Sequence, residues 1–286
     1  RVLALEGEFP STILTWRHRA REAEAEFVMI PRPEDDDWTR VILEAIDERT
    51  AVAALPHCHW LDGIRIDLVR VSRRLRDVGA ALVLDLTQSL GAMPFDLAAV
   101  DPDFLVAACY KWLMGPYSIG MLHVAERWHE GRPLENHWFG RAGSENFSAL
   151  TGYPDQYQPG ARRFDAGEPA NFALLPAAIE AVERILDWGV ASISDTAGAL
   201  NAEIVARTEP LGFSAPSPAI RAPHYLALRA AAPLPPDLAE RFAAERVYLS
   251  VRGGQSVRIS PHVYNERWEV DRLVSVLERS RLGSAA

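Results

Sequence analysis

A carboxylate and a lysine stand at positions where they can hold a reactive small molecule. Asp85 directly follows the apolar run Ala81–Leu84, and Lys111 interrupts a second apolar run further along the chain. At the ends of neighbouring buried strands, such a pair suits a cofactor with a pyridine ring and an aldehyde. The carboxylate pairs with the protonated ring nitrogen, and the lysine forms a Schiff base. The segment Ala81–Val124 therefore predicts an enzyme.

Each of these residues also has an ordinary explanation. A lone Asp after a strand is often a helix cap, Gln88 has the residue type of a surface position, and a lysine can extend its amine to solvent. Lys111, however, is the only charged residue between Asp103 and His123. Desolvation lowers the pKa of a lysine and makes it nucleophilic. If a helix follows Asp85, Gln88 reaches the same site and donates to the ring's phenolic oxygen.

The elements that must position these residues follow a βαβ rhythm. Continuous apolar runs predict strands that are covered on both faces. The predicted strands are Val2–Leu5, Phe27–Ile30, Ala51–Leu55, Ala81–Leu86, Phe104–Ala107 and Gly120–Val124. Helical spacing predicts helices over Trp38–Asp47 and Leu68–Val78, and Gly79 is a stop signal. The predicted fold class is α/β, with a mostly parallel sheet flanked by helices.

The second part of the chain is predicted to form a smaller domain. The Gly-, Pro-, Tyr- and Asn-rich segment Asn136–Pro169 is too long for an ordinary connection, so we expect an ordered, functional loop. Helices are predicted at Pro176–Leu186, Ile193–Thr208 and Glu269–Arg281, and strands at Tyr225–Leu228, Val247–Val251 and Ser256–Ile259. We place the domain change near Trp188. This gives a large domain of residues 1–188 and a C-terminal α+β domain of residues 189–286.

Composition and charge narrow the class of partner. The 286 residues are 48% hydrophobic and 24% charged, so the chain can bury a substantial core. A net charge of −9 disfavours nucleic acid and anionic membrane surfaces as partners. The two cysteines, Cys58 and Cys109, indicate neither a disulfide framework nor a zinc site, and no apolar stretch is long enough to span a membrane. We expect a cytoplasmic protein that acts on small molecules.

The segments around the chemical residues resemble a known group of enzymes. The DLTQ segment at 85–88, the YKW segment at 110–112 and the VRISPHVYNERWEVDRL segment at 257–273 are together similar to fold-type I pyridoxal-5′-phosphate (PLP) enzymes of the class V aminotransferase group. Kynureninase-like members are the most similar. The resemblance covers nearly the whole chain and implies PLP as cofactor. It also implies Lys111 as the internal aldimine lysine, Asp85 as the partner of the pyridine nitrogen and Gln88 as the contact to the ring oxygen.

The resemblance extends to further cofactor contacts. Phe9 and Ser11 belong to a Phe-Pro-Ser segment where the group places an aromatic ring against the cofactor and a serine beside it. Tyr110 matches a tyrosine that contacts the phosphate. Trp138 matches an aromatic residue near the phosphate that often comes from the partner subunit, so the resemblance implies a homodimer with shared active sites. The alternatives are a core aromatic for Phe9 and loop packing for Trp138.

Other residues are candidates for contacts to the substrate. Arg258 resembles the arginine that holds the α-carboxylate of an amino acid, because a guanidinium forms a two-pronged pair with a planar anion. His59 and Trp60 follow the strand Ala51–Leu55 and are candidates for shaping the substrate pocket. His57 and His59 form a His-x-His pair, but no third ligand follows at a convincing spacing, so we expect no metal site.

Arg163 and Glu168 fall where many members of the group carry an Arg and a Gly-Thr pair. Glu168 replaces the threonine that would reach the phosphate of the neighbouring subunit. Members also carry further residues before the Phe-Pro-Ser strand, including part of the phosphate site. We therefore expect a truncated sequence whose large domain is incomplete at its N-terminus.

The expected function is a PLP-dependent enzyme of the aminotransferase class V type that acts on an α-amino acid through a Lys111 aldimine. A kynureninase-like C–C hydrolase is one alternative, because transamination, racemisation and hydrolysis begin from the same adduct. A catalytically silent, truncated scaffold is another. Cysteine desulfuration is disfavoured because no cysteine follows Cys109. An α/β hydrolase is disfavoured because the Gly-x-Ser-x-Gly motif does not occur.

Overall fold

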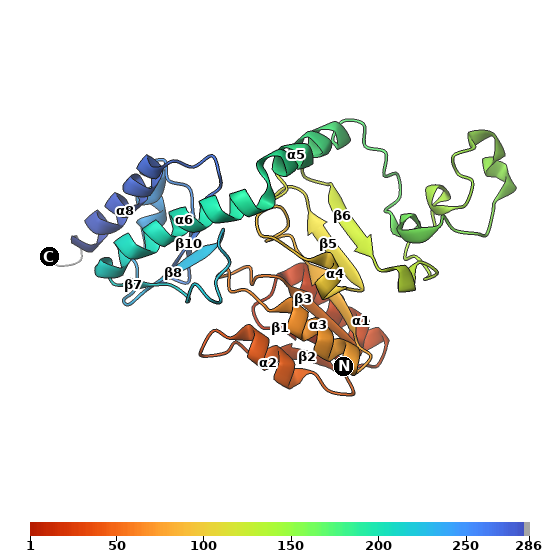
Figure 1. Ribbon diagram of the computed structural model, residues 1–286, viewed down its shortest axis with the longest axis horizontal. Helices are drawn as coiled ribbons and strands as arrows, with labels where there is room; N and C mark the ends of the chain where they lie inside the picture. Colours follow the sequence, from red (N-terminus) through yellow and green to blue (C-terminus); the bar gives the residue numbers. More distant parts are fainter. Residues whose placement is uncertain (283–286) are drawn as a thin grey trace.

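The computed structural model describes residues 1–282 and contains two sheets (Figure 1). The larger sheet has the strand order β2-β1-β3-β4-β5-β6. Its strands are β1 Val2–Leu5, β2 Phe27–Ile30, β3 Val52–Pro56, β4 Ala81–Asp85, β5 Phe104–Ala108 and β6 Gly120–Val124. Neighbouring strands from β2 to β5 run parallel, whereas β6 runs antiparallel to β5. The β5–β6 connection therefore turns back at the carboxyl end of the sheet.

The helices between these strands begin at capping residues. They are α1 Pro10–Glu22, α2 Trp38–Ala45, α3 Leu68–Asp77 and α4 Leu97–Val100. Asp37, Asp67 and Asp96 cap the last three of these helices, because each carboxylate accepts from a backbone N–H of the first turn. The step from β1 to β2 runs along the sheet in the opposite direction to the steps from β2 to β3 and from β3 to β4. Right-handed crossovers therefore place α1 on the opposite face from α2 and α3.

The smaller sheet is antiparallel, with the strand order β7-β8-β10-β9. Its strands are β7 Phe213–Ser214, β8 Leu226–Ala230, β9 Ser250–Arg252 and β10 Ser256–Ile259, and its helices are α6 Val190–Thr208, α7 Leu238–Ala244 and α8 Arg267–Leu282. Leu228, Phe242, Val257 and Leu277 belong to its hydrophobic core. The short helix η5 Glu209–Leu211 follows α6. This sheet and its helices confirm the predicted α+β part.

The two parts meet where α5 Leu175–Trp188 gives way to α6. Gly189 separates these helices with a φ of 78°, a backbone conformation that glycine adopts without a steric penalty. The break lies one residue beyond the predicted domain change at Trp188. Ile193, Ala222 and Tyr225 nevertheless pack into the core of the larger sheet, so the two parts share buried surface.

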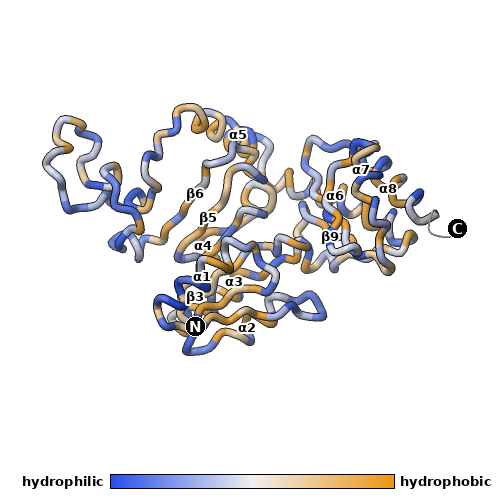
Figure 2. The backbone as a smooth tube through the Cα atoms, turned by 180° about the vertical axis from the view of Figure 1, so that it is seen from behind, coloured by the Kyte–Doolittle hydropathy of each residue, from blue (hydrophilic) through white to orange (hydrophobic). Residues whose placement is uncertain are grey.

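Between β6 and α5 the chain forms an extended arm, residues 129–174. Figures 1 and 2 show this arm reaching away from both sheets. It contains only short helices, η2 Trp138–Gly140, η3 Phe147–Gly152 and η4 Gly160–Phe164, and η1 Glu126–Trp128 precedes it. Figure 2 colours much of the arm as hydrophilic, yet Leu134, Phe147, Tyr153 and Phe172 are each at least 77% exposed.

The strand pattern predicted the α/β fold class, and the structure confirms it. Three helices, α1, the four-residue α4 and α7, were not predicted. Only Ala20 of α1 is buried, so this helix shows little apolar periodicity in its sequence. The seven residues of α7 follow a Pro- and Ala-rich loop. Within residues 1–282, no helix combines the length and the apolar character needed to cross a membrane.

Candidate active site

Most of the predicted cofactor residues converge at the carboxyl end of the parallel sheet. Asp85 is the last residue of β4 and lies in register with Pro56 of β3 and Val106 of β5. Open α/β sheets bind ligands at this edge. A cavity of about 180 Å³ opens there. It is lined by Glu8, Phe9, Ser11, Pro56, Cys58, Trp60, Asp85, Thr87, Gln88, Ala108, Tyr110 and Lys111.

The turn after β4 fixes the carboxylate and the amide. The backbone N–H of Thr87 donates to Asp85 Oδ1 over 2.9 Å, and Thr87 Oγ1 accepts from Ala108 N over 3.0 Å. These bonds join the ends of β4 and β5. Residues 87–92 form turns instead of the helix on which the placement of Gln88 depended, yet Gln88 still lines the cavity. Trp112 Nε1 donates to Gln88 Oε1 over 3.4 Å, so the amide NH₂ is the group left for a ligand.

Lys111 lies in the loop between β5 and β6 and is half-buried. Its Nζ is 5.7 Å from the ring centre of Phe9 and 5.7 Å from that of Tyr110. Burial lowers the pKa of Lys111, while the neighbouring carboxylate of Asp85 opposes this shift. It is also the only lysine among the 286 residues. The cavity thus holds the single side-chain amine of the chain.

A glycine lets the lysine loop approach the turn after β4. Gly91 has a φ of 93°, and a Cβ atom at this position would lie 2.7 Å from the carbonyl oxygen of Trp112. No side chain fits at that distance without movement of the backbone. Gly91 therefore sets the position of the segment that carries Lys111.

A larger cavity of about 500 Å³ adjoins the first and reaches the smaller sheet. Phe9, Trp60, Gln88, Tyr110 and Lys111 line both cavities. The larger one adds Trp112, Met114, Tyr225, Arg252, Arg258, Ser260, His262 and Tyr264. The candidate site therefore lies at the junction of the two parts of the chain.

Trp60 forms the contact between these parts. Its indole N–H donates to the carbonyl of Gly7 over 2.6 Å, and its own carbonyl accepts from the Tyr225 hydroxyl and, over 3.3 Å, from Arg258 Nη1. The Arg258 guanidinium lies 6.0 Å from the ring centre of Trp60 and 5.6 Å from that of Tyr225. Burial raises the pKa of Tyr225, which keeps the hydroxyl protonated as a donor. Arg258 is thus oriented by two aromatic rings.

His59 lines neither of these two cavities. Its side chain is fully buried and stacks on Trp38 at 5.2 Å between ring centres. Its Nε2 lies 3.1 Å from the carbonyl of Glu6, and its Nδ1 lies 3.7 Å from a carboxylate oxygen of Asp62. His59 therefore packs in the core beside the loop after β3 and lies close to Gly7, whose carbonyl accepts from Trp60.

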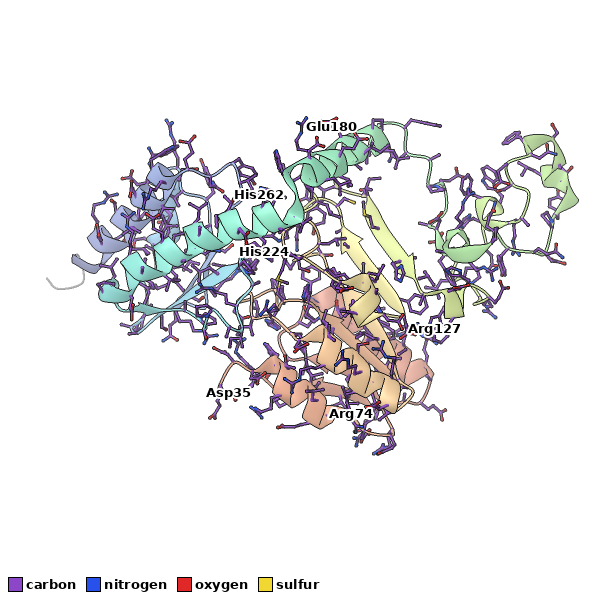
Figure 3. All side chains as sticks on the ribbon, viewed as in Figure 1. Asp35, Arg74, Arg127, Glu180, His224 and His262 are labelled. Carbon is purple, nitrogen blue, oxygen red and sulfur yellow. The ribbon has the colours of Figure 1, made fainter. Side chains whose placement is uncertain are left out.

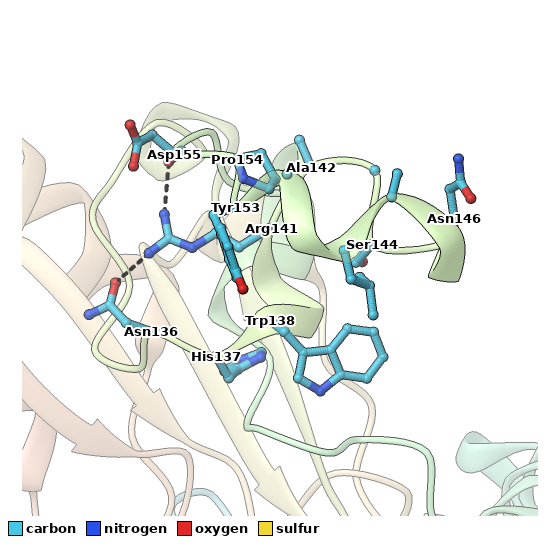
Figure 4. Close-up of a pocket in the computed structure, with 14 residues that line it drawn as sticks. Asn136, His137, Trp138, Arg141, Ala142, Ser144, Asn146, Tyr153, Pro154 and Asp155 are labelled. Carbon is cyan, nitrogen blue, oxygen red and sulfur yellow. Dashed lines mark hydrogen bonds between the residues drawn. The ribbon is translucent and has the colours of Figure 1, made fainter.

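Trp138 also lies apart from Lys111 within one chain. It lines a separate cavity of about 580 Å³ in the arm, which Figure 4 shows with Arg141 bound to Asp155 and Asn136. The indole N–H of Trp138 donates to Glu168 Oε1 over 2.8 Å. Arg163 is buried in the same arm and donates to the carbonyl of Gln158. Neither Glu168 nor Arg163 lines the cavities at Lys111.

Several residues of the site were not predicted. Glu8 follows β1 closely, as Asp85 ends β4, so the same signal of an acidic residue after an apolar strand was available. The rings of His224 and His262 both contact Trp112, with ring centres 4.4 and 5.9 Å from it, and Figure 3 shows both histidines near the start of α6. Burial lowers the pKa of His224 to about 4. Only the fold brings these two histidines together.

Comparison with known proteins places the chain among aminotransferase sequences. Residues 1–273 match the family described as Aminotransferase class-V. The chain is 28% identical over 228 residues to the uncharacterized aminotransferase YcbU of Bacillus subtilis (strain 168), which covers 79% of this chain and 58% of that protein. It is 35% identical over 102 residues to the kynureninase of Burkholderia mallei (strain SAVP1), which covers 35% of this chain and 24% of that protein. The match thus spans less than two thirds of either relative.

Solved structures share the fold. The apo cysteine desulfurase from Thermococcus onnurineus NA1 superimposes with a TM-score of 0.81 at 21% identity, covering 97% of this chain and 72% of that chain. A mutant of C-DES, with glycine covalently linked to its PLP cofactor, superimposes with a TM-score of 0.81 at 17% identity, covering 96% of this chain and 74% of that chain. This likeness confirms the predicted fold-type I architecture.

Proposed function

Because the chain belongs to the aminotransferase class-V family, we propose that it is a PLP-dependent enzyme that acts on an α-amino acid. One observation carries the proposal: the only lysine of the chain is half-buried in the same cavity as Asp85. When bound, PLP supplies an electron sink for the electron pair left on the substrate's Cα.

The residues around the smaller cavity fit this cofactor. The lowered pKa of Lys111 increases the fraction of free amine, which is the form that attacks an aldehyde. Asp85 provides a carboxylate for a pyridinium N–H, and Gln88 provides amide donors for a ring oxygen. Phe9 offers an aromatic face, while Ser11 and Tyr110 offer hydroxyl groups for a phosphate. These five residues and Lys111 form the proposed cofactor site.

The larger cavity is the proposed substrate site. Arg258 binds the α-carboxylate of the amino acid with its planar guanidinium. Trp60 and Tyr225 hold that guanidinium in place, so the substrate's Cα is oriented relative to Lys111. The free amine of Lys111 would serve as the general base that takes the proton from Cα. His59 has a supporting role behind Trp60 in this proposal.

The arm supports the proposal that two copies share their active sites. Trp138 lies in a segment that extends away from its own sheet and exposes large apolar side chains. We assign a second copy of this chain as the partner that covers them, with Trp138 completing the site of that copy. The double variant Leu134→Asp, Phe147→Asp should sediment as a monomer, whereas Leu186→Asp on the exposed face of α5 should leave the dimer intact. Monomeric wild-type protein would contradict the assignment.

The experiment for the cofactor role exploits the single lysine. Protein saturated with PLP should show the absorption band of a protonated imine, and borohydride should fix the pyridoxyl group on the peptide that contains Lys111. Lys111→Arg keeps the charge and should lose both signals. A wild-type protein without the band, or with the label only on the N-terminal amine, would leave the silent scaffold as the function.

A second candidate function is C–C hydrolysis, which the identity to a kynureninase over 102 residues favours. Product analysis separates the two reactions, because a transaminase yields a 2-oxo acid and a hydrolase yields a shortened amino acid and an acid. The two free cysteines, Cys58 and Cys109, are both buried. Free thiols suit a reducing compartment, so we also propose the cytoplasm as the location.

A further inference from the structure

A second buried carboxyl group, that of Glu8, lines the cavity of Asp85 and Lys111. Glu8 lies between β1 and α1 and is 9% exposed. Its Oε1 accepts from the backbone N–H of Phe9 over 2.7 Å. Its Oε2 is buried and has no hydrogen-bond partner within the described residues. A buried carboxylate oxygen without a partner is costly, so this group favours the neutral form.

Two nearby carboxylates act on Glu8 in the same direction as burial, and Lys111 acts against them. Asp62 follows β3 and Asp85 ends β4, and both repel a carboxylate at Glu8, whereas Lys111 attracts one. Burial, as the largest influence, raises the pKa of Glu8 to about 7. The other ionisable groups that act on Glu8 or Lys111 are Cys58, whose pKa is raised by burial, and Arg258 from β10. Lys111 carries a single positive charge, and Asp85 already provides one carboxylate to pair with it.

We propose that Glu8 is a positioning residue that sets the charge of Lys111. While the Glu8 carboxyl is neutral, the lysine faces one carboxylate, that of Asp85. When Glu8 ionises, its carboxylate stabilises the ammonium form of Lys111 and lowers the fraction of amine that can attack an aldehyde. The inference rests on the proposed role of Lys111. It implies that ionisation of Glu8 above neutral pH keeps a larger fraction of Lys111 in the ammonium form.

The single lysine permits a test that needs no cofactor. Lys111 is labelled with acetic anhydride, and its rate is compared with that of the N-terminal amine in the same sample by peptide mass spectrometry. Glu8→Gln keeps the acceptor for the Phe9 N–H and cannot ionise. At about pH 6, Lys111 of this variant should be acetylated at the wild-type rate. At about pH 8.5, its acetylation rate should exceed that of the wild type about threefold or more. Glu34→Gln, at an exposed position, should follow the wild type at both pH values.

The pH profile separates this role from a structural one. A variant that merely loosens the cavity changes the rate by the same factor at both pH values, and that result would overturn the proposal. Because the reagent is not PLP, failure of the protein to bind PLP affects the proposed function alone.

A measurement on wild-type protein covers the case in which Glu8→Gln does not fold. Reductive methylation with ¹³C-formaldehyde gives one lysine resonance, and its titration should show a separate inflection near pH 7. A profile with a single inflection from the lysine itself would refute the coupling.

Discussion

Arg229 holds Asp36 through both of its terminal nitrogens, with Nη1 2.5 Å from Oδ2 and Nη2 2.9 Å from Oδ1. Arg229 belongs to β8 of the smaller sheet, and Asp36 precedes α2 of the larger part. Arg32 donates to the same carboxylate over 3.1 Å and also pairs with Asp62. This two-pronged pair links the smaller sheet to the segment that precedes α2.

Breaking this pair should destabilise the protein. Arg229→Ala should lower the free energy of unfolding at neutral pH by about 1–2 kcal/mol, because the pair is two-pronged and partly buried. Arg40→Ala, which removes exposed pairs with Asp35 and Glu44, should cost about 0.5 kcal/mol or less. Equal losses in urea denaturation would contradict the distinction.

The same pair predicts a pH dependence. Burial opposes ionisation of Asp36, yet Arg229 and Arg32 hold its pKa below the ordinary value. The stability from this group is therefore present above the pKa of Asp36 in the unfolded chain and is lost as the pH falls through its lower pKa in the folded chain. The difference between Arg229→Ala and wild type should shrink in acid.

The buried His224 should make the stability depend on pH in a second, higher range. Its Nε2 donates to the Gln88 carbonyl over 2.6 Å, and burial lowers its pKa to about 4. The unfolded chain binds a proton at a higher pH than the folded chain, so stability should fall as the pH drops from about 6.5 to about 4. His224→Leu should reduce this slope in equilibrium denaturation. Exposed His18→Leu should leave it unchanged, and an unchanged slope in His224→Leu would contradict the assignment.

Alanine substitutions at Gly91 and Gly79 distinguish the effect of backbone strain from that of a steric contact. Both have positive φ, at 93° and 71°, but a Cβ at Gly79 meets nothing within 4 Å, whereas one at Gly91 meets Trp112. Gly91→Ala should shift the loop of Lys111 and weaken PLP binding about tenfold or more. Gly79→Ala should lower stability by about 1 kcal/mol and keep the affinity. The affinities come from titration with PLP, and equal affinities would exclude a positioning role for Gly91.

Arg258→Lys tests the proposed carboxylate site. Lysine keeps the charge but loses the planar fork, so KM for the amino acid should rise about tenfold or more, with a smaller change in kcat. Arg252 also lies over Trp60, at 5.6 Å, and lines the same cavity. Arg252→Lys is the matched control, and its KM should change much less. A larger effect at Arg252 would transfer the carboxylate role to that residue.

The apolar strands made most of the fold predictable. Val2–Leu5 has the predicted bounds and all four of its residues are buried, because a strand covered on both faces is a continuous apolar run with clear ends. Helix α1 lacked such a signal, since its buried face is small. The Asp85, Gln88 and Lys111 positions were predictable because each lies at or shortly after the end of a strand, and these strands end at the same edge of the sheet.

The remaining site residues depend on long-range packing. His59 and Trp60 are neighbours in the loop after β3, but the side chain of His59 is fully buried and stacks on Trp38, whereas Trp60 lines the cavities. Tyr225 and Arg258 reach Trp60 only after the smaller sheet has packed against the larger part. No local pattern reports such contacts.

The single lysine of the chain has a consequence for the electrostatics of the whole molecule. Every other basic side chain, apart from the histidines, is an arginine, which keeps its charge throughout the alkaline range. Above the range in which the N-terminal amine and the histidines titrate, the positive charge of the surface is therefore constant. Over the next few pH units, alkali can neutralise one cation in the chain, and that cation lies inside the cavity.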